Sequence, residues 1–199
     1  MQPGSMPIYN PVSTFLLIII SQILISLPSA SHAAPPSAYV TDLGNSVTII
    51  DTATNQVTGS VSPPIAAGLF GIAVSPDGST LYVADGNHTV DVIHSPGDNP
   101  TFDSVMLDES LSPFSLAVTS DGSTVYVANA GSSTVSVIDT SDNSVTSIDI
   151  GCDQNGTNSC SSTPPISVTP ISGAGNVYVY VGTLTGFAVI DTATQSLKE

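Results

Sequence analysis

The sequence almost lacks positive charge. Among its 199 residues, 16 are Asp or Glu and one is basic, Lys198, next to the last residue. Because proteins recognise phosphate groups mainly through Lys and Arg, we expect no nucleic-acid partner. An anionic membrane surface is unfavourable for the same reason. Solubility is the simplest explanation of the net charge of −15, and attraction of an electropositive partner is the alternative.

Charged residues of either sign are also few, at 9% of the chain against 41% hydrophobic residues, which is unlike a highly charged disordered protein. The polar surface must therefore consist mostly of Ser, Thr, Asn and Gly. The sequence contains neither a Gly-x-Ser-x-Gly nucleophile elbow nor a phosphate-binding loop. We expect no catalytic residues and no cofactor, and an enzyme is the less favoured interpretation.

The first 33 residues have the pattern of a targeting segment. Phe15 to Leu27 is mostly apolar, which suits the core of a signal peptide and is short for a membrane span. Small residues at Ser31 and Ala33 fit cleavage after Ala33. No Lys or Arg precedes the apolar run, which departs from the usual signal-peptide pattern. The sequence thus predicts a signal peptide at 1–33 and a domain at 34–199 that is secreted, periplasmic or on the cell surface. An uncleaved anchor is the alternative.

Cysteines are scarce: the two present, Cys152 and Cys160, lie in one segment rich in Asn, Ser and Gly. In an exported protein, two cysteines this close indicate a local disulfide. A zinc site would need more ligands, and no His lies nearby in the sequence. We predict a disulfide that pins a long loop, with metal binding or free thiols as alternatives.

One phrase recurs four times along the chain. It starts with Tyr-Val and is followed by an apolar run that usually ends in Ile-Asp or Ile-Asp-Thr. The tyrosines are Tyr39, Tyr82, Tyr126 and Tyr178, separated by 43, 44 and 52 residues. Segments rich in β-branched and aromatic residues, punctuated by Pro, Asp, Asn and Gly, indicate four strands in each complete repeat. A repeat of this length is typical of a propeller blade.

The expected strands of the second repeat are 70–74, 80–84, 89–93 and 103–107, and those of the third are 115–118, 124–128, 134–138 and 144–150. In the fourth repeat the first strand is expected at 166–168, and the fourth at 195–199. The predicted fold is therefore all-β, a β-propeller of four-stranded antiparallel blades with about four blades present and the propeller incomplete.

These phrases resemble the YVTN β-propeller repeat family over about residues 38–195. Tyr-Val-Ala-Asn at 126–129, Ser-Pro-Asp-Gly at 75–78 and Val-Ile-Asp-Thr at 137–140 carry the resemblance. It implies a secreted or surface propeller and, for many members, no assigned enzymatic activity. Family propellers usually have more repeats, so this chain is a fragment, or is closed by a partner, or forms a small four-bladed ring. Open strand edges would allow association.

Asp42, Asp85 and Asn129 occupy equivalent positions at the ends of the second strands, where the fourth copy has Val181. Blade geometry puts these ends on one face, together with the loop that holds the cysteines. Their oxygens could surround a cation at a channel mouth. The competing interpretation is that Asp and Asn favour the following turn, because no dense Asp-x-Asp-x-Asp loop is present. We expect no metal.

Other polar residues are better explained by local structure. Asp77 and Asp121 precede glycines in turns, and Asp51, Asp139 and Asp191 recur after the third strands. His88 and His94 lie at opposite ends of one expected strand, too far apart to share a metal ion. Asn87 and Asn155 begin glycosylation sequons on expected loops, which matter only in a host that glycosylates.

The sequence favours an exported, non-catalytic propeller module for binding or surface display. Its partner would be a protein, a sugar or a small molecule that the sequence does not identify. The alternative is a propeller-type enzyme, such as a lactonase-like hydrolase or a quinoprotein-associated subunit. An enzyme would need non-repeating polar residues that converge on the channel, whereas the strand-end residues mostly follow the repeat.

Overall fold

The computed structural model describes residues 37–42, 44–64, 66–97, 99–130, 132–150, 165–172, 177–183 and 187–198. The chain separates into two compact units, Met1–Pro35 and Pro36–Glu199, and the described residues all belong to the second. The predicted signal peptide, the predicted disulfide between Cys152 and Cys160, and the sequon at Asn155 lie outside the described residues and stay predictions. In the described part, no helix is long and apolar enough to cross a membrane.

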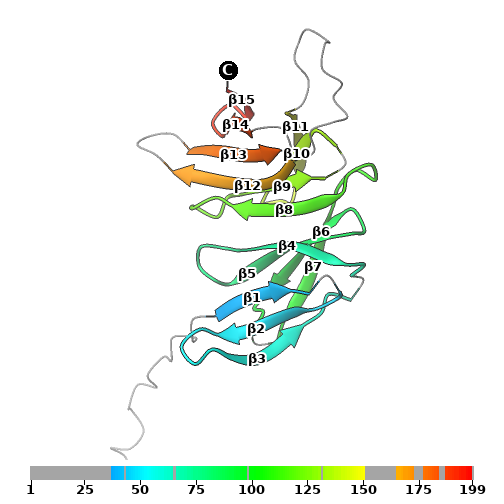
Figure 1. The fold of residues 1–199 in the computed structure, drawn as a ribbon, viewed down its shortest axis with the longest axis vertical. Helices are drawn as coiled ribbons and strands as arrows, with labels where there is room; N and C mark the ends of the chain where they lie inside the picture. The colour runs from blue at the N-terminus through cyan, green and yellow to red at the C-terminus, as the bar shows by residue number, and fades with distance from the viewer. Residues whose placement is uncertain are drawn as a thin grey trace, which may run out of the picture. The chain divides into compact units, whose positions relative to one another are not determined.

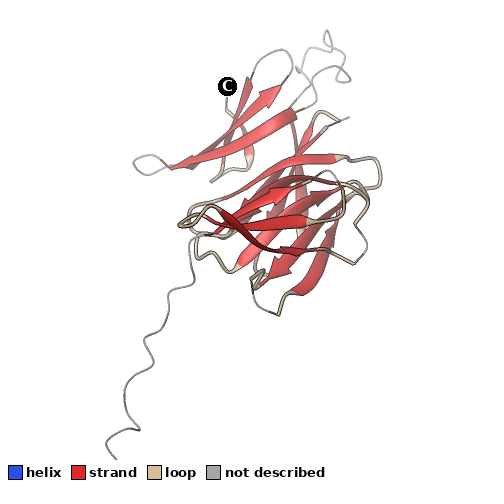
Figure 2. Ribbon diagram, turned by 60° about the horizontal axis from the view of Figure 1, so that its bottom comes forward, coloured by secondary structure: helices blue, strands red, loops and turns tan. Residues whose placement is uncertain are grey.

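All regular structure in the described residues is β-strand (Figure 2). The strands are β1 (Ser37–Thr41), β2 (Val47–Asp51), β3 (Gln56–Val61), β4 (Leu69–Val74), β5 (Thr80–Asp85), β6 (Thr89–His94), β7 (Thr101–Met106), β8 (Pro113–Val118), β9 (Thr124–Asn129), β10 (Thr134–Asp139), β11 (Val145–Asp149), β12 (Pro165–Ser172), β13 (Val177–Thr183), β14 (Phe187–Asp191) and β15 (Ser196–Leu197). They form the sheets β1-β2-β3, β4-β5-β6-β7, β8-β9-β10-β11 and β12-β13-β14-β15, in which each strand pairs antiparallel with the next along the chain (Figure 1). This meander is the topology of a propeller blade, so the all-β, bladed fold predicted from the repeat is confirmed.

The Tyr-Val strands β5 and β9 carry unbroken apolar runs because these strands are buried on both faces. In β5, Leu81 and Val83 belong to the apolar cluster shared with the first sheet. Tyr82 and Ala84, which alternate with them, belong to the cluster shared with the third sheet. Successive side chains of a strand point to opposite faces, so a strand between two neighbouring blades needs an unbroken apolar run.

Three apolar clusters join the sheets in chain order, one for each pair of successive sheets. Between the second and third sheets, β4 and β8 approach closely at Gly71. A Cβ atom on Gly71 would lie 2.7 Å from the carbonyl oxygen of Phe114 and 2.8 Å from the Cα of Ser115. The Phe70 and Phe114 rings lie beside this contact, with centroids 5.7 Å apart. Gly71 is therefore a requirement of the packing between blades.

The expected strand bounds of the second and third repeats agree with the structure to within two residues. The fourth repeat differs. Its first strand, β12, continues through Pro170 to Ser172, although we expected it to end at Val168. β12 is an edge strand that pairs with β13 alone, and an edge strand tolerates a proline that lacks an N–H group. Its last strand, β15, covers only Ser196–Leu197.

The aspartates expected in turns lie in turns. Asp77 accepts the backbone N–H of Ser79 at 3.1 Å, and Asp121 accepts that of Ser123 at 3.1 Å. The glycines that follow them, Gly78 and Gly122, have φ angles of 75° and 76°, which side chains rarely adopt. Three further aspartates accept a backbone N–H two residues ahead: Asp51, Asp139 and Asp191.

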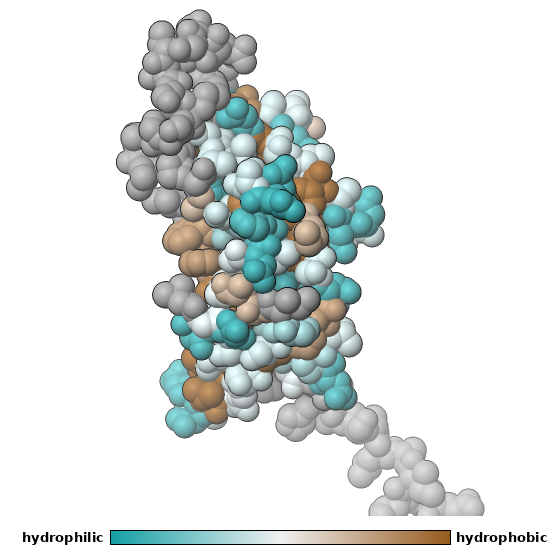
Figure 3. Space-filling view, turned by 90° about the vertical axis from the view of Figure 1, so that its right-hand side faces the viewer, coloured by the Kyte–Doolittle hydropathy of each residue, from teal (hydrophilic) through white to brown (hydrophobic). Residues whose placement is uncertain are grey.

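The surface view agrees with a polar exterior that depends little on charge. On the face shown in Figure 3, pale residues of intermediate hydropathy are interspersed with smaller hydrophilic and hydrophobic areas. Ser, Thr and Gly, which we expected on the surface from the composition, have intermediate hydropathy. Exposed large apolar side chains in the described residues include Phe187, at 75% exposure, and Met106, at 67%. Met106 borders the candidate site.

Candidate functional site

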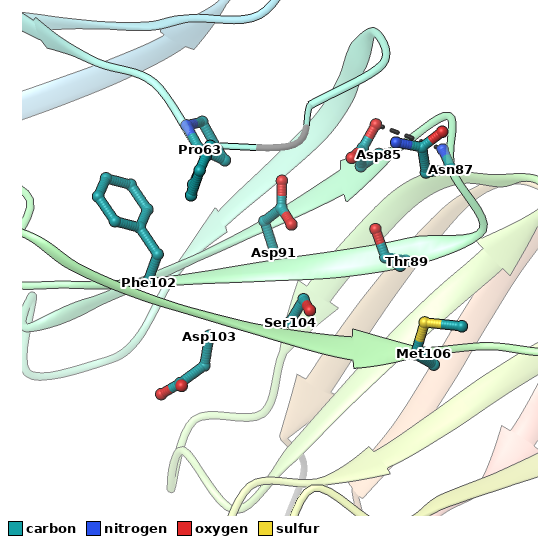
Figure 4. A pocket seen from close by; sticks show the side chains of 10 residues that line it. Pro63, Asp85, Asn87, Thr89, Asp91, Phe102, Asp103, Ser104 and Met106 are labelled. Carbon is teal, nitrogen blue, oxygen red and sulfur yellow. Dashed lines mark hydrogen bonds between the residues drawn. The ribbon is translucent and has the colours of Figure 1, made fainter.

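A pocket of about 520 Å³ lies against the second sheet (Figure 4). This volume falls within the usual range for small-molecule sites. The connection from β3 to β4 contributes two prolines, and the other lining residues come from β5, β6, β7 and the turn between β5 and β6. The lining residues are Pro63, Pro64, Asp85, Asn87, Thr89, Asp91, Phe102, Asp103, Ser104 and Met106.

Strand register explains why polar residues meet in this pocket. Asp85 of β5 lies opposite Thr89 of β6, and Asp91 of β6 lies opposite Ser104 of β7. Thr89 and Asp91 are two residues apart, so they share one face of the sheet. Phe102 and Ser104 share the same face of β7, and the Phe102 side chain also contacts the apolar cluster between the first and second sheets. The pocket therefore combines a polar part with an apolar wall.

Asp91 is the most unusual residue of the site. Its side chain is only 7% exposed, and its Oδ2 atom is buried without a hydrogen-bond partner among the residues that the structure describes. Burial, and next the negative charge of Asp85, raise the pKa of the Asp91 carboxyl to about 6. Figure 4 shows the carboxyl group pointing into the space between Pro63 and Asp85. It is a buried acceptor that faces a pocket.

Asp85 has structural partners. It is 1% exposed, and its Oδ1 atom accepts the backbone N–H groups of Ala67 at 2.8 Å and Asn87 at 3.3 Å. These bonds tie the turn after β5 to the segment that enters β4. Gly86 permits the contact, because a Cβ atom there would lie 2.7 Å from the carbonyl oxygen of Ala67. Asp85 therefore fixes one side of the pocket and places a second carboxylate near Asp91.

Each of the three predicted strand-end residues has hydrogen-bond partners of its own in the structure. Asp42 is exposed and accepts the Gly44 N–H at 2.9 Å and the Ser46 hydroxyl at 2.8 Å; the Ser46 hydroxyl bond and then the Gly44 bond lower its pKa. Asn129 is fully buried within the third sheet. Within the described ranges, no three His, Cys, Asp or Glu side chains are grouped so that they could hold a metal ion.

The third blade shows how the same positions are satisfied by a different set of residues. Asn129 takes the place of Asp85, and its Nδ2 group donates to Ser136 Oγ at 2.9 Å and to Thr134 Oγ1 at 3.2 Å. Ser136 takes the place of Asp91. An amide supplies donors, whereas two ionised carboxylates supply none. The Asn129 Oδ1 atom also lacks a partner in the described part, but Asn129 is not one of the residues that line the pocket.

Sequence reasoning included Asp85 and missed Asp91. The signal was present in the repeat, because the same position of the third strand is Thr48, Asp91, Ser136 and Ala188 in the four copies. Asp91 is the only acid among them and stands between two valines. An acid in the middle of a strand that is buried on both faces breaks the repeat in one blade alone, as a site-specific residue would.

The two histidines do not contribute to the acidic part of the pocket. His88 Nδ1 hydrogen-bonds the carbonyl oxygen of Leu111, which links the turn before β6 to the segment that enters β8. His94 Nε2 lies 3.2 Å from Asp103 Oδ2. Figure 4 shows the Asp103 side chain on the opposite side of β7 from Phe102. The predicted sequon residue Asn87 is exposed at the rim, in the turn between β5 and β6.

The comparisons with known proteins identify a fold. No protein-family model matches the sequence, and no curated protein matches it either. Among 780 matching solved chains is the hydrazine synthase of Kuenenia stuttgartiensis, with a TM-score of 0.64 and 24% sequence identity. The match covers 82% of this chain and 45% of that one, so this chain spans less than half the length of the synthase chain it matches. At this identity the likeness shows a shared bladed fold, and a fold this common does not assign an activity.

Proposed function

We propose that the protein is an exported, non-catalytic β-propeller module that binds a small-molecule ligand in the pocket of its second blade. The observation that carries the proposal is the Asp91 carboxyl, which lines the pocket while its Oδ2 atom is buried without a partner in the described part of the chain. Native proteins pair nearly all their buried polar atoms, and an unpaired one beside a pocket can be completed by a group that binds there.

The make-up of the pocket supports binding. Ligand sites are usually apolar concavities with a few well-placed polar groups. Here Pro63, Phe102 and Met106 supply apolar surface, and Asp91 supplies the buried acceptor. The module's export rests on the signal pattern of residues 1–33, and its membership of the YVTN family rests on the recurring phrases. Both are part of the proposal.

A propeller-type hydrolase is the second candidate, and one observation favours it. A carboxyl whose pKa is raised to about 6 beside a second carboxylate is suited to accept a proton from a reacting water. Asp85, however, is occupied by two backbone N–H groups. The described lining residues also contain no His or Cys that could act with Asp91. Binding without chemistry is therefore the better explanation.

A ligand screen on the purified chain tests the proposal. Sugars, short peptides and small charged and neutral organic molecules would be tested by thermal shift and then by calorimetry. We expect at least one class to bind and to lose affinity in D91N. The control is D142N, which removes an exposed carboxylate from a turn of the third blade. No binding in any class, or binding that D91N leaves unchanged, would contradict the proposal. Lactone hydrolysis that D91N abolishes while substrate still binds would favour the hydrolase.

A further inference from the structure

The ligand chemistry can be specified from the groups that line the pocket. This inference rests on the proposed function and goes one step beyond it. We infer that the pocket binds an organic monocation, with a protonated amine or guanidinium group beside Asp91 and an apolar body against Phe102, Pro63 and Met106.

The buried oxygen of Asp91 lacks a donor. Asp91 Oδ2 needs a hydrogen-bond donor, and ionised carboxylates such as Asp85 can only accept. In the third blade the donor is the amide of Asn129, which reaches Ser136 at 2.9 Å. The second blade has replaced both residues by acids. No described residue of the blade donates to Asp91 Oδ2, so we infer a donor from outside, and a cationic N–H group is the strongest partner for a carboxylate.

The described part of the protein supplies no cation that could serve instead. None of the described residues that line the pocket is basic. The one basic residue of the sequence, Lys198, is engaged on the fourth sheet. Its Nζ donates to the Tyr178 hydroxyl at 3.0 Å and lies 4.2 Å from the centre of that ring. With a net charge of −15, the protein attracts cations and repels anionic ligands.

The site favours an organic cation over a metal ion. Calcium takes six to eight oxygen ligands and magnesium requires near-octahedral geometry. The described residues bring no three acidic or His side chains together for that purpose, and the Asp103 side chain lies on the other side of β7. A metal ion also gains nothing from an apolar wall. Phe102, in contrast, offers an aromatic ring against which an organic cation can lie.

The apolar wall also indicates that the ligand has an apolar body. Pro63 is buried, Phe102 is half-buried and the Met106 side chain is 67% exposed. Methionine is flexible and adapts to irregular apolar groups. An exposed Met beside a half-buried Phe loses contact with water when an apolar group covers it, which adds to affinity. A small inorganic cation such as ammonium would leave this surface uncovered.

The experiment uses matched probes on the purified chain at pH 7.5 and low salt. Calorimetry would compare 2-phenylethylamine with its neutral analogue 2-phenylethanol and with the anion phenylacetate. Larger aromatic amines and guanidines extend the cationic set. We expect the amine to bind at least tenfold more tightly than the alcohol, and phenylacetate not to bind. D91N should lower the affinity for the amine by roughly 10- to 100-fold, because a hydrogen bond to a charged group is stronger than a neutral one. It should leave the affinity for the alcohol unchanged.

The controls keep the two proposals distinguishable. D142N should leave the affinity for all probes unchanged, and near-ultraviolet circular dichroism should show that D91N keeps the native fold. If the alcohol binds as tightly as the amine, or if D91N leaves amine binding unchanged, the inference is wrong. A neutral ligand that binds in the pocket more tightly than every cationic probe would overturn the inference and leave the binding function intact. No binding by any cationic, neutral or anionic probe would contradict both.

Discussion

Asp91 and Ser136 occupy the same position in successive blades, yet they are satisfied differently. Ser136 Oγ accepts a hydrogen bond from Asn129 Nδ2 at 2.9 Å, whereas Asp91 Oδ2 has no partner in the described structure. The neighbours at the end of the preceding strand explain the difference, because Asn129 has donors to give and Asp85 does not. The third blade is thus a natural reference for what the second blade lacks, and D91N is a chemically matched way to restore a donor.

The first prediction concerns stability near neutral pH. The folded-state pKa of Asp91 is about 6, above its ordinary value of 3.8. A raised folded pKa gives stability that is fully present below 3.8 and is lost as pH rises through about 6. The difference between these two values corresponds to roughly 3 kcal/mol. D91N should therefore raise the free energy of unfolding at pH 7.5 by up to about that amount and change it little at pH 3.5.

Urea unfolding of the wild type and D91N at these two pH values checks this prediction. D142N is the control, and it should not show the same gain at pH 7.5. If D91N changes stability by the same amount at both pH values, the contribution of Asp91 does not depend on its ionisation, and its pKa is not raised as we state.

The second prediction concerns stability at acidic pH. The Ser75 hydroxyl, followed by the Ser79 backbone N–H, lowers the pKa of Asp77 to about 2. The Thr119 hydroxyl lowers that of Asp121 in the equivalent turn. A lowered pKa gives stability that is present above the ordinary value near 4 and lost as pH falls through the folded value. The melting temperature of the wild type should fall between pH 4 and pH 2, and that of D77A should fall less steeply. If the melting temperature of D77A falls as steeply as that of the wild type, the Asp77 turn does not cause the loss of stability at acidic pH.

The third prediction concerns the backbone contact that frames the pocket. In Gly86→Ala the new Cβ would lie 2.7 Å from the Ala67 carbonyl oxygen, so the turn after β5 and the segment before β4 must separate. Overpacking of this kind costs about 1–3 kcal/mol. The control is Gly59→Ala on β3, where a Cβ would meet nothing within 4 Å. Urea unfolding should show a loss for Gly86→Ala alone, and equal stability of the two variants would contradict the close contact.

The repeat predicted the blades well for a physical reason. Alternating residues of β5 and β9 enter two different apolar clusters, so the positions of the Tyr-Val phrase are under the same demand in these two blades. Asp77 and Asp121 were also predictable, because a turn that needs a positive φ at the next residue selects the same dipeptide each time. Features imposed by local geometry recur at the period of the repeat.

The site was less predictable, because it depends on departures from the repeat. Asp85, which we expected on the channel face, is buried and accepts the N–H of Ala67, which lies in a segment outside the recurring phrase. Asp91 lacks a donor because the neighbouring strand end carries a carboxylate where the third blade has an amide. No strand pattern encodes the path of the segment between β3 and β4. Asp91 could have been singled out only as the one acid at its repeat position.

The last prediction concerns the pH dependence of cation binding, and it follows from the proton that Asp91 holds. Its carboxyl must be ionised to attract an ammonium group, and its pKa is about 6. Below that value a proton competes with the ligand, so affinity for 2-phenylethylamine should fall about tenfold for each pH unit. Above it, affinity should level off while the amine stays protonated. Calorimetry from pH 4.5 to 8 gives the curve.

Other charged groups near the pocket affect how the pH dependence of amine binding is interpreted. Asp85 of β5 faces Asp91 and raises its pKa, and bound amine should lower it again. Asp103 of β7 lies on the other side of its strand, 3.2 Å from His94, so this pair should affect the curve little. D142N, in a turn of the third blade, serves as a control that keeps the inflection near pH 6. In D91N the inflection should disappear, and an inflection that persists there would show that another group holds the proton that competes with the ligand.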